Sequence, residues 1–207
     1  MDIHHLPAYE LANKIKNKEI SSLELTQHFI DRIEKYDDKI NAVVVRTFED
    51  AIEAAKKADE AISKQDSLGP LHGIPMTIKE SYNIQGQCTS WGIPDYKGNI
   101  AKEDGLAVQR LKKAGAHFLG KTNVPMNLAD FQSYNDIYGI TGNPWDLKKT
   151  PGGSSGGSAA ALAAGFCSLE AGSDIGGSIR NPAHYCVVYG HKPRHGIIPS
   201  SGHELIP

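Results

Sequence analysis

The sequence predicts an α/β fold, in which a mixed sheet is flanked by helices and preceded by a helical N-terminal layer. In the first third of the 207 residues, apolar side chains recur at the period of a helix. Beyond residue 74, short apolar runs alternate with helical segments, an order typical of α/β proteins. Two Gly/Ser-rich loops interrupt the second half of the chain.

Residues 7–63 form the expected helical layer. The apolar residues that keep a spacing near 3.6 are Leu11, Ile15, Ile20, Leu23, Leu25, Phe29, Ile30 and Ile33. Ser21 and Glu24 predict a capping box at a helix start. The β-branched run at 41–46 predicts a strand, and the Ala-rich segment 51–62 predicts a helix.

The turn-forming residues Ser67–Pro70 predict a boundary between the helical layer, residues 1–66, and a catalytic core, residues 67–207, within one structural domain. In the core, Gly115 and Gly165 predict helix ends. Residues 139–150 show no periodicity and are expected to form a loop. The other expected elements are strands at 74–78, 116–120, 168–173 and 187–191, and helices at 105–114, 125–129, 155–164 and 178–184.

Composition excludes several classes of function. The net charge of −2 gives no electrostatic basis for binding nucleic acid or an anionic membrane. No apolar run is long enough to span a membrane, and the start of the chain lacks a signal-peptide pattern. Neither the three cysteines nor the nine histidines have metal-ligand spacing, so we expect no metal and no cofactor. We expect a reducing, cytoplasmic setting.

The two Gly/Ser-rich loops carry the chemical signal. Residues 151–158 read PGGSSGGS, and residues 172–182 read GSDIGGSIRNP. Glycine lets the backbone approach a ligand closely, and consecutive N–H groups in such a turn form an anion-binding concavity. A serine hydroxyl becomes a useful nucleophile only beside a base. The two loops therefore indicate acyl-transfer chemistry with an oxyanion hole.

Lys79, at the end of the expected strand 74–78, is the candidate base. A lysine must be neutral to accept a proton, and burial lowers its pKa. Ile74, Met76 and Ile78 predict that Lys79 is buried, and Glu80 should point to the opposite face of the strand.

Several separated segments together resemble the amidase signature family over about residues 71–199. They are HGIP with the following Lys79, GKTNVP at 120–125, NPWD at 143–146 and the two serine loops. The resemblance implies a serine amidohydrolase with a Ser–cis-Ser–Lys triad: Ser178 as nucleophile, Ser154 as bridging serine after a cis peptide bond, and Lys79 as general base. The implied substrate is a small amide, cleaved through an acyl-enzyme on Ser178.

The resemblance also implies binding roles. Backbone N–H groups of the nucleophile loop would form the oxyanion hole, and Leu128 matches a substrate-lining position in the fatty-acid amide hydrolase branch. Asp174 and Arg180 are expected to brace the nucleophile loop, and Ser155 to support the first loop or cap the next helix. The expected oxyanion-hole residues are Ile175, Gly176, Gly177 and Ser178.

Two alternatives stay open. Residues 153–157 also match G-x-S-x-G, the nucleophile elbow that would make Ser155 the nucleophile, but a polar loop rather than a strand precedes them. The chain also ends soon after the nucleophile loop, earlier than is usual for the family, so we expect the N-terminal part of an amidase core. A non-catalytic or assembly-dependent subunit, for example of the amidotransferase type, is therefore the second hypothesis. Residues 124–127 and 194–199 depart from that type, and a homo-oligomer is compatible with the sequence.

Overall fold

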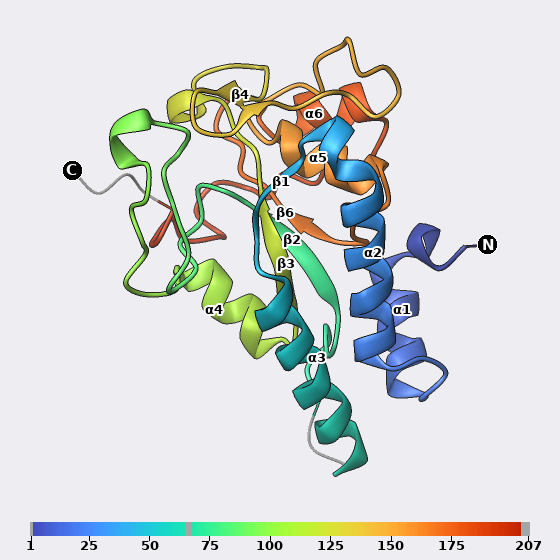
Figure 1. Ribbon diagram of the computed structural model, residues 1–207. Coiled ribbons are helices and arrows are strands. Elements are labelled where there is room, and N and C mark those ends of the chain that lie inside the picture. Colours follow the sequence, from blue (N-terminus) through green and yellow to red (C-terminus); the bar gives the residue numbers. More distant parts are fainter. Residues whose placement is uncertain (1, 65–67, 204–207) are drawn as a thin grey trace.

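The computed structural model describes residues 2–64 and 68–203, which form a mixed sheet with helices on both faces (Figure 1). The helices are α1 (Ala8–Lys16), α2 (Ser22–Ile40), α3 (Phe48–Ser63), α4 (Leu106–Lys113), α5 (Gly156–Ala163) and α6 (Arg180–Cys186). The strands are β1 (Val43–Arg46), β2 (Pro75–Lys79), β3 (His117–Thr122), β4 (Tyr134–Asn135), β5 (Gly139–Ile140) and β6 (Glu170–Ala171). Short 3-10 turns occupy Ile3–His5, Pro94–Tyr96 and Met126–Leu128.

The main sheet has the strand order β1-β3-β2-β6. Strand β2 is parallel to both β3 and β6, whereas β1 runs antiparallel to β3. The sheet is therefore mixed, as expected. Strands β4 and β5 form a separate two-stranded antiparallel ribbon.

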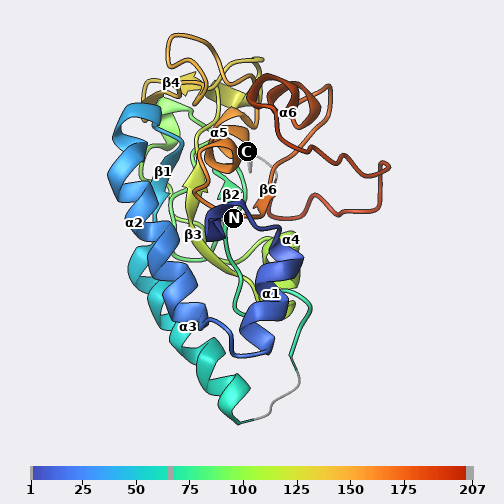
Figure 2. The same ribbon diagram turned by 90° about the vertical axis from the view of Figure 1, so that its right-hand side faces the viewer.

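Successive side chains along β2 point to opposite faces of the sheet. Met76 and Ile78 belong to an apolar cluster with Val108 of α4. The larger core lies on the other face, where Phe29 of α2 packs with Ala160 of α5. Accordingly, α2 and α4 lie on opposite sides of the central strands in Figure 1. Figure 2 shows α5 beside α6, at the same end of the molecule as β4.

The helix signals of the N-terminal layer are confirmed. Ser21 caps α2 with a full capping box: its Oγ accepts from Glu24 N at 3.0 Å, and a Glu24 carboxylate oxygen accepts from Ser21 N at 2.9 Å. Gly115 and Gly165 have φ values of +98° and +68° just past the ends of α4 and α5. The predicted domain boundary falls on residues 65–67, outside the described residues, and the division stays a prediction.

Several element predictions differ from the structure. Residues 187–191 form no strand: Val187 takes the left-handed conformation as the C-cap of α6, and residues 188–191 pair with no strand in the described part of the chain. The expected helix 125–129 is a single 3-10 turn, because Asn127 and Leu128 have positive φ. The expected loop 139–150 begins with β5, which pairs with β4. The strand at 168–173 is only two residues long.

Candidate functional site

Lys79 is fully buried at the C-terminal end of β2. Because side chains alternate across a strand, Lys79 faces α5, whereas Met76 and Ile78 face α4. The expected burial of Lys79 is confirmed, although Met76 and Ile78 lie on the opposite face of the sheet. The Lys79 amine instead lies among the hydroxyl groups of the two serine loops.

Lys79 Nζ donates to Ser154 Oγ at 2.7 Å and to Ser173 Oγ at 2.9 Å. Burial lowers the pKa of Lys79 to about 7, an effect that the nearby carboxylates of Glu170 and Asp174 oppose. The amine is thus close to half-neutral at physiological pH, as a lysine base requires. The sequence motifs do not identify Ser173 as a partner of Lys79. Its position in the second serine loop, directly before Asp174, was the signal that could have suggested this contact.

The first serine loop leads from Pro151 into α5. The peptide bond between Gly153 and Ser154 is cis, the geometry that the family resemblance implied for this position. Ser154 is almost completely buried. Ser155 occupies the N-cap position of α5, but its side chain makes no cap hydrogen bond.

Ser155 connects the first loop to the second. Its Oγ donates to the carbonyl of Ser173 at 3.1 Å, and its backbone N–H donates to the carbonyl of Ser178 at 3.0 Å. The Ser178 backbone is thereby placed beside the Ser154–Ser155 peptide. Within the described part of the chain, Ser178 Oγ makes no hydrogen bond, and the residue is partly exposed.

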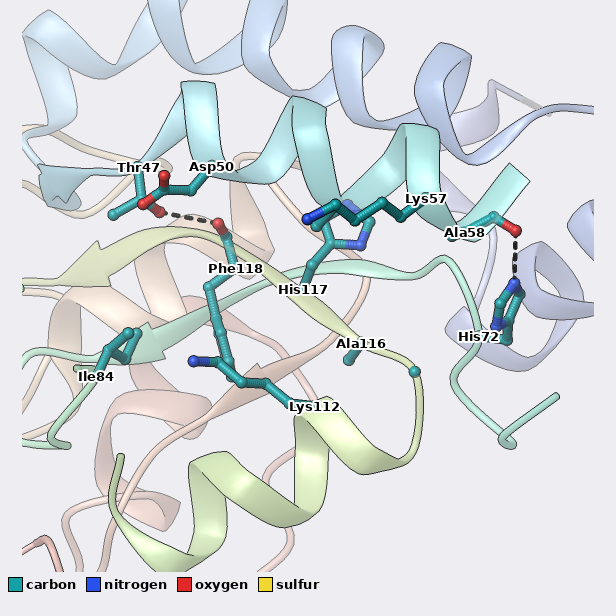
Figure 3. Close-up of a pocket in the computed structure, with 12 residues that line it drawn as sticks. Thr47, Asp50, Lys57, Ala58, His72, Ile84, Lys112, Ala116, His117 and Phe118 are labelled. Atoms are coloured by element: carbon teal, nitrogen blue, oxygen red, sulfur yellow. Dashed lines mark hydrogen bonds between the residues drawn. The ribbon is translucent and has the colours of Figure 1, made fainter. Parts of the chain in front are cut away.

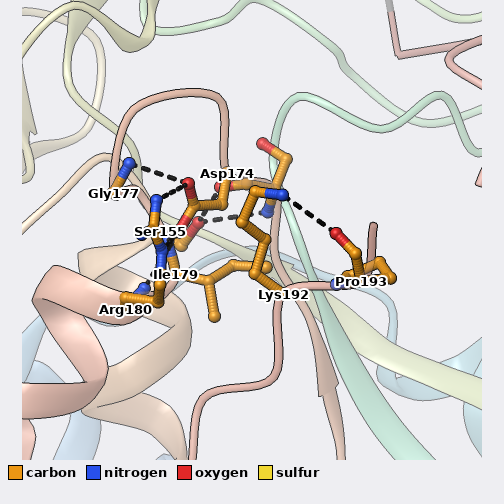
Figure 4. Close-up of polar contacts among 8 residues, drawn as sticks. Ser155, Asp174, Gly177, Ile179, Arg180, Lys192 and Pro193 are labelled. Atoms are coloured by element: carbon orange, nitrogen blue, oxygen red, sulfur yellow. Dashed lines mark hydrogen bonds and ion pairs between the residues drawn. The ribbon is translucent and has the colours of Figure 1, made fainter. Parts of the chain in front are cut away.

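Asp174 organises the second serine loop, residues 172–182 (Figure 4). Its carboxylate accepts from the Gly177 N–H at 2.7 Å and the Ile179 N–H at 3.0 Å. It also accepts from Arg180, through the backbone N–H and two guanidinium nitrogens. Burial works against ionisation, but these hydrogen bonds outweigh it and hold the pKa of Asp174 well below its usual range.

The expected oxyanion-hole residues fall into two groups. The Gly177 N–H is engaged by Asp174, which differs from the expectation that it faces the substrate. The N–H groups of Ile175, Gly176 and Ser178 donate to no residue in the described ranges. Ile175 is fully exposed, so this part of the loop is open to an approaching ligand.

Leu128 is not joined to the serine loops by any hydrogen bond among the described residues. It is half-buried at the end of the 3-10 turn at 126–128. Phe131, three residues further on, lies beside the second serine loop: a Cβ at Gly177 would be 3.5 Å from its ring. No motif in the sequence could have identified Phe131.

Glu80 points away from Lys79, as the strand alternation predicted. Its carboxylate accepts from Ser90 N at 2.7 Å, from Trp91 N at 2.9 Å and from Tyr138 Oη at 3.1 Å. It is fully buried in this network. Glu80 therefore fixes the segment after β2 and leaves the Lys79 amine free to contact the serines.

A separate pocket of about 470 Å³ lies between α3 and α4 (Figure 3). Its lining includes His72, His117 and Phe118 but none of Lys79, Ser154 and Ser178. His117 Nε2 is hydrogen-bonded to Thr26 Oγ1 at 2.8 Å, and His72 Nε2 to the Ala58 carbonyl at 2.9 Å. The Nε2 atoms of His72 and His117 thus hydrogen-bond to residues of the helical layer, in α3 and α2 respectively.

Within residues 2–64 and 68–203, no group of three or more His, Cys, Asp or Glu side chains could hold a metal ion. In the same ranges, no helix is both long and apolar enough to cross a membrane.

Comparison with known proteins matches most of this chain, including both serine loops and Lys79. The model of the family described as Amidase matches residues 24–205. A glutamyl-tRNA(Gln) amidotransferase subunit of Moorella thermoacetica is 42% identical over 205 residues, which cover 98% of this chain and 42% of that protein. Fatty-acid amide hydrolase 2-A of Danio rerio is 40% identical, over 95% of this chain and 38% of that protein.

Solved structures show the same relationship. The peptide amidase of Stenotrophomonas maltophilia superposes with a TM-score of 0.90 at 33% identity, over 96% of this chain and 42% of that one. A fatty acid amide hydrolase gives a TM-score of 0.84 at 36% identity, over 87% of this chain and 32% of that one. The chain thus spans about two fifths of the length of the curated relatives it matches.

Proposed function

Because this chain belongs to the amidase family, we propose that it carries the catalytic centre of a serine amidohydrolase that cleaves a carboxylic amide C–N bond. The observation that carries the proposal is the 2.7 Å contact between the buried Lys79 Nζ and Ser154 Oγ, beside the loop that bears Ser178. A buried amine on a serine hydroxyl is the arrangement that activates a serine nucleophile.

The proposed reaction begins with a proton relay. Neutral Lys79 accepts the proton of Ser154, and Ser154 accepts the proton of Ser178. The Ser178 Oγ then attacks the amide carbonyl carbon and forms a tetrahedral intermediate. The C–N bond then breaks, and the amine leaves with the relayed proton. In the second half of the reaction, water gives a proton to the same relay and attacks the acyl carbon. The C–O bond to Ser178 breaks, Ser178 Oγ regains the relayed proton, and the carboxylic acid is released. Such base catalysis accounts for roughly 10²–10⁴ in rate.

The oxyanion of that intermediate needs preorganised donors. The Gly177 N–H already donates to Asp174. The N–H groups of Ile175, Gly176 and Ser178 are therefore the donors that can bind the oxyanion. One such donor contributes about 3 kcal/mol to transition-state stabilisation. Asp174 and Arg180 keep the loop in shape, and Phe131 with Leu128 supplies apolar surface for the substrate side chain.

The experiment that tests the proposal is hydrolysis of a panel of small aliphatic and aryl amides. Ser178→Ala should abolish the activity, whereas Ser155→Ala should retain a measurable fraction, because Ser155 only links the loops. Full loss in Ser155→Ala together with activity in Ser178→Ala would instead support the nucleophile elbow. The cytoplasmic setting and a homo-oligomer stay predictions.

A second candidate is an assembly-dependent subunit of the amidotransferase type. Two observations favour it: the match to an amidotransferase component, and the exposed apolar side chains near α6, which are Tyr185, Val187 and Tyr189. In this case the chain would hydrolyse amides only with a partner. Normal turnover by the isolated protein, unchanged over a wide range of protein concentration, would exclude it.

A further inference from the structure

Glu170 shares one face of the sheet with the proposed base. In the parallel pairing of β2 and β6, Glu170 lies opposite Thr77, and Thr77 is two residues before Lys79. In the pairing of β2 and β3, Thr122 lies opposite Lys79. Paired residues, and residues two apart on a strand, point to the same face. Thr77, Lys79, Thr122 and Glu170 therefore all face α5.

The Glu170 carboxylate is anchored on this face. Thr122 Oγ1 donates to Glu170 Oε1 at 2.8 Å, and Thr122 Oγ1 lies 2.9 Å from Ser158 Oγ. Ser158 belongs to α5, which begins directly after the loop that contains Ser154. Through Thr122 and Ser158, the carboxylate is thus held next to α5, the helix that directly follows the first serine loop. The proposed relay assigns it no role.

Among the described residues, Glu170 and Asp174 are the carboxylates whose charges act on Lys79. Their hydrogen-bond and ion-pair partners differ. Asp174 is occupied by Arg180 and three backbone N–H groups. Glu170 has no cationic partner within 4 Å among the described residues. Burial raises the pKa of Glu170 to about 7, and the hydroxyls of Thr122 and Ser158 and the charge of Lys79 work against this rise.

The other titratable groups around this pair are neutral near pH 7. Burial raises the pKa of Tyr82 and of Cys167 to about 12. Burial, with a smaller effect from Lys79, lowers the pKa of His203 to about 4. The charge that the buried amine experiences therefore comes from Glu170 and Asp174.

Resting on the proposed function, we propose that Glu170 is a positioning residue for the base: its anchored carboxylate, on the neighbouring strand β6 and on the same face of the sheet as Lys79, makes the amine a stronger base than burial alone would leave. The physical reason is general. Burial weakens a lysine base, and a weaker base transfers protons less effectively. A fixed carboxylate restores part of the lost basicity without touching the substrate.

The test compares pH–rate profiles of the wild type, Glu170→Gln, Glu170→Asp and an exposed-site control, Glu103→Gln. In Glu170→Gln the acidic limb of kcat/KM should move to lower pH, by less than the roughly 1–3 units that one fully ionised opposite charge causes, because Glu170, with a pKa of about 7, is only partly ionised at the limb. The plateau rate should fall because the base is weaker. Glu170→Asp, which keeps the charge, should return the limb toward the wild-type position, and Glu103→Gln should match the wild type.

A second measurement does not depend on turnover. The Nζ resonance of Lys79 in [15N]lysine-labelled protein, assigned by its loss in Lys79→Met, should titrate at lower pH in Glu170→Gln than in the wild type. An identical titration in both proteins would overturn the proposal, as would a loss of rate with an unmoved acidic limb. If the wild type hydrolyses no amide while the resonance shifts as expected, the proposed function fails and the Glu170–Lys79 coupling stands.

Discussion

Replacing Lys79 by methionine should remove a specific pH dependence of stability. Lys79 is fully buried, and burial lowers its pKa to about 7, with Glu170 and Asp174 opposing. In the unfolded chain the pKa of a lysine is about 10.4. Between these two values the unfolded state binds a proton that the native state does not. Stability therefore rises with pH through this window, and the rise ends near pH 10.

The size of the effect follows from proton linkage. Between pH 7 and pH 9 the wild type should gain about 2 kcal/mol in free energy of unfolding relative to Lys79→Met. The steepest part of the difference is about 1.4 kcal/mol per pH unit. Below about pH 6, one unit under the native pKa, the lysine is protonated in both states, so the difference between the two proteins becomes constant.

Urea unfolding at a series of pH values measures this difference. Lys121, which is also buried and whose pKa burial lowers to about 8, contributes equally to the wild type and to Lys79→Met, so it cancels. Lys113→Met, at an exposed position on α4, is the control for loss of one lysine and should follow the wild type. Parallel curves for the wild type and Lys79→Met would show that Lys79 is charged in the native protein, which contradicts its role as a base.

Three further outcomes are expected. Ser154→Ala should lower kcat by roughly 10²–10⁴, and Lys79→Ala/Ser154→Ala should be no slower than the slower single variant; losses that add in log rate would contradict the relay. Asp174→Asn should cost about 1–3 kcal/mol of stability at pH 7 and less as the pH falls toward the depressed pKa of Asp174, measured by urea unfolding; a constant cost would contradict this. Phe29→Ala should cost about 3–5 kcal/mol in the same assay, because Phe29 is fully buried in the larger core; a cost under 1 kcal/mol would contradict that packing.

Local signals in the sequence were sufficient for the helices. Ser21 and Glu24 satisfy each other within one turn, so their capping box depends on no distant residue. Gly115 and Gly165 end helices because a positive φ suits glycine wherever the helix packs. The same holds for Lys79, whose place at the end of β2 follows from the apolar run before it.

Tertiary contacts explain what the sequence did not reveal. The β-branched residues after α6 suggested a strand, but Val187 takes the left-handed conformation that ends the helix. Gly177 was expected to face the substrate, yet Asp174 captures its N–H from three residues earlier. Glu170 is near Lys79 only because β6 pairs with β2, a contact between segments about 90 residues apart in the chain.

The central claim, that Ser178 is a nucleophile activated through Ser154 and Lys79, is tested most directly by covalent labelling. The protein is incubated with a fluorophosphonate probe, digested, and the modified peptide is identified by mass spectrometry. We expect modification of Ser178, with the labelling rate strongly reduced in Ser154→Ala and Lys79→Ala and little changed in Lys113→Met. Modification of Ser155 in place of Ser178, or labelling of Ser178 at the wild-type rate in Lys79→Ala, would contradict the claim.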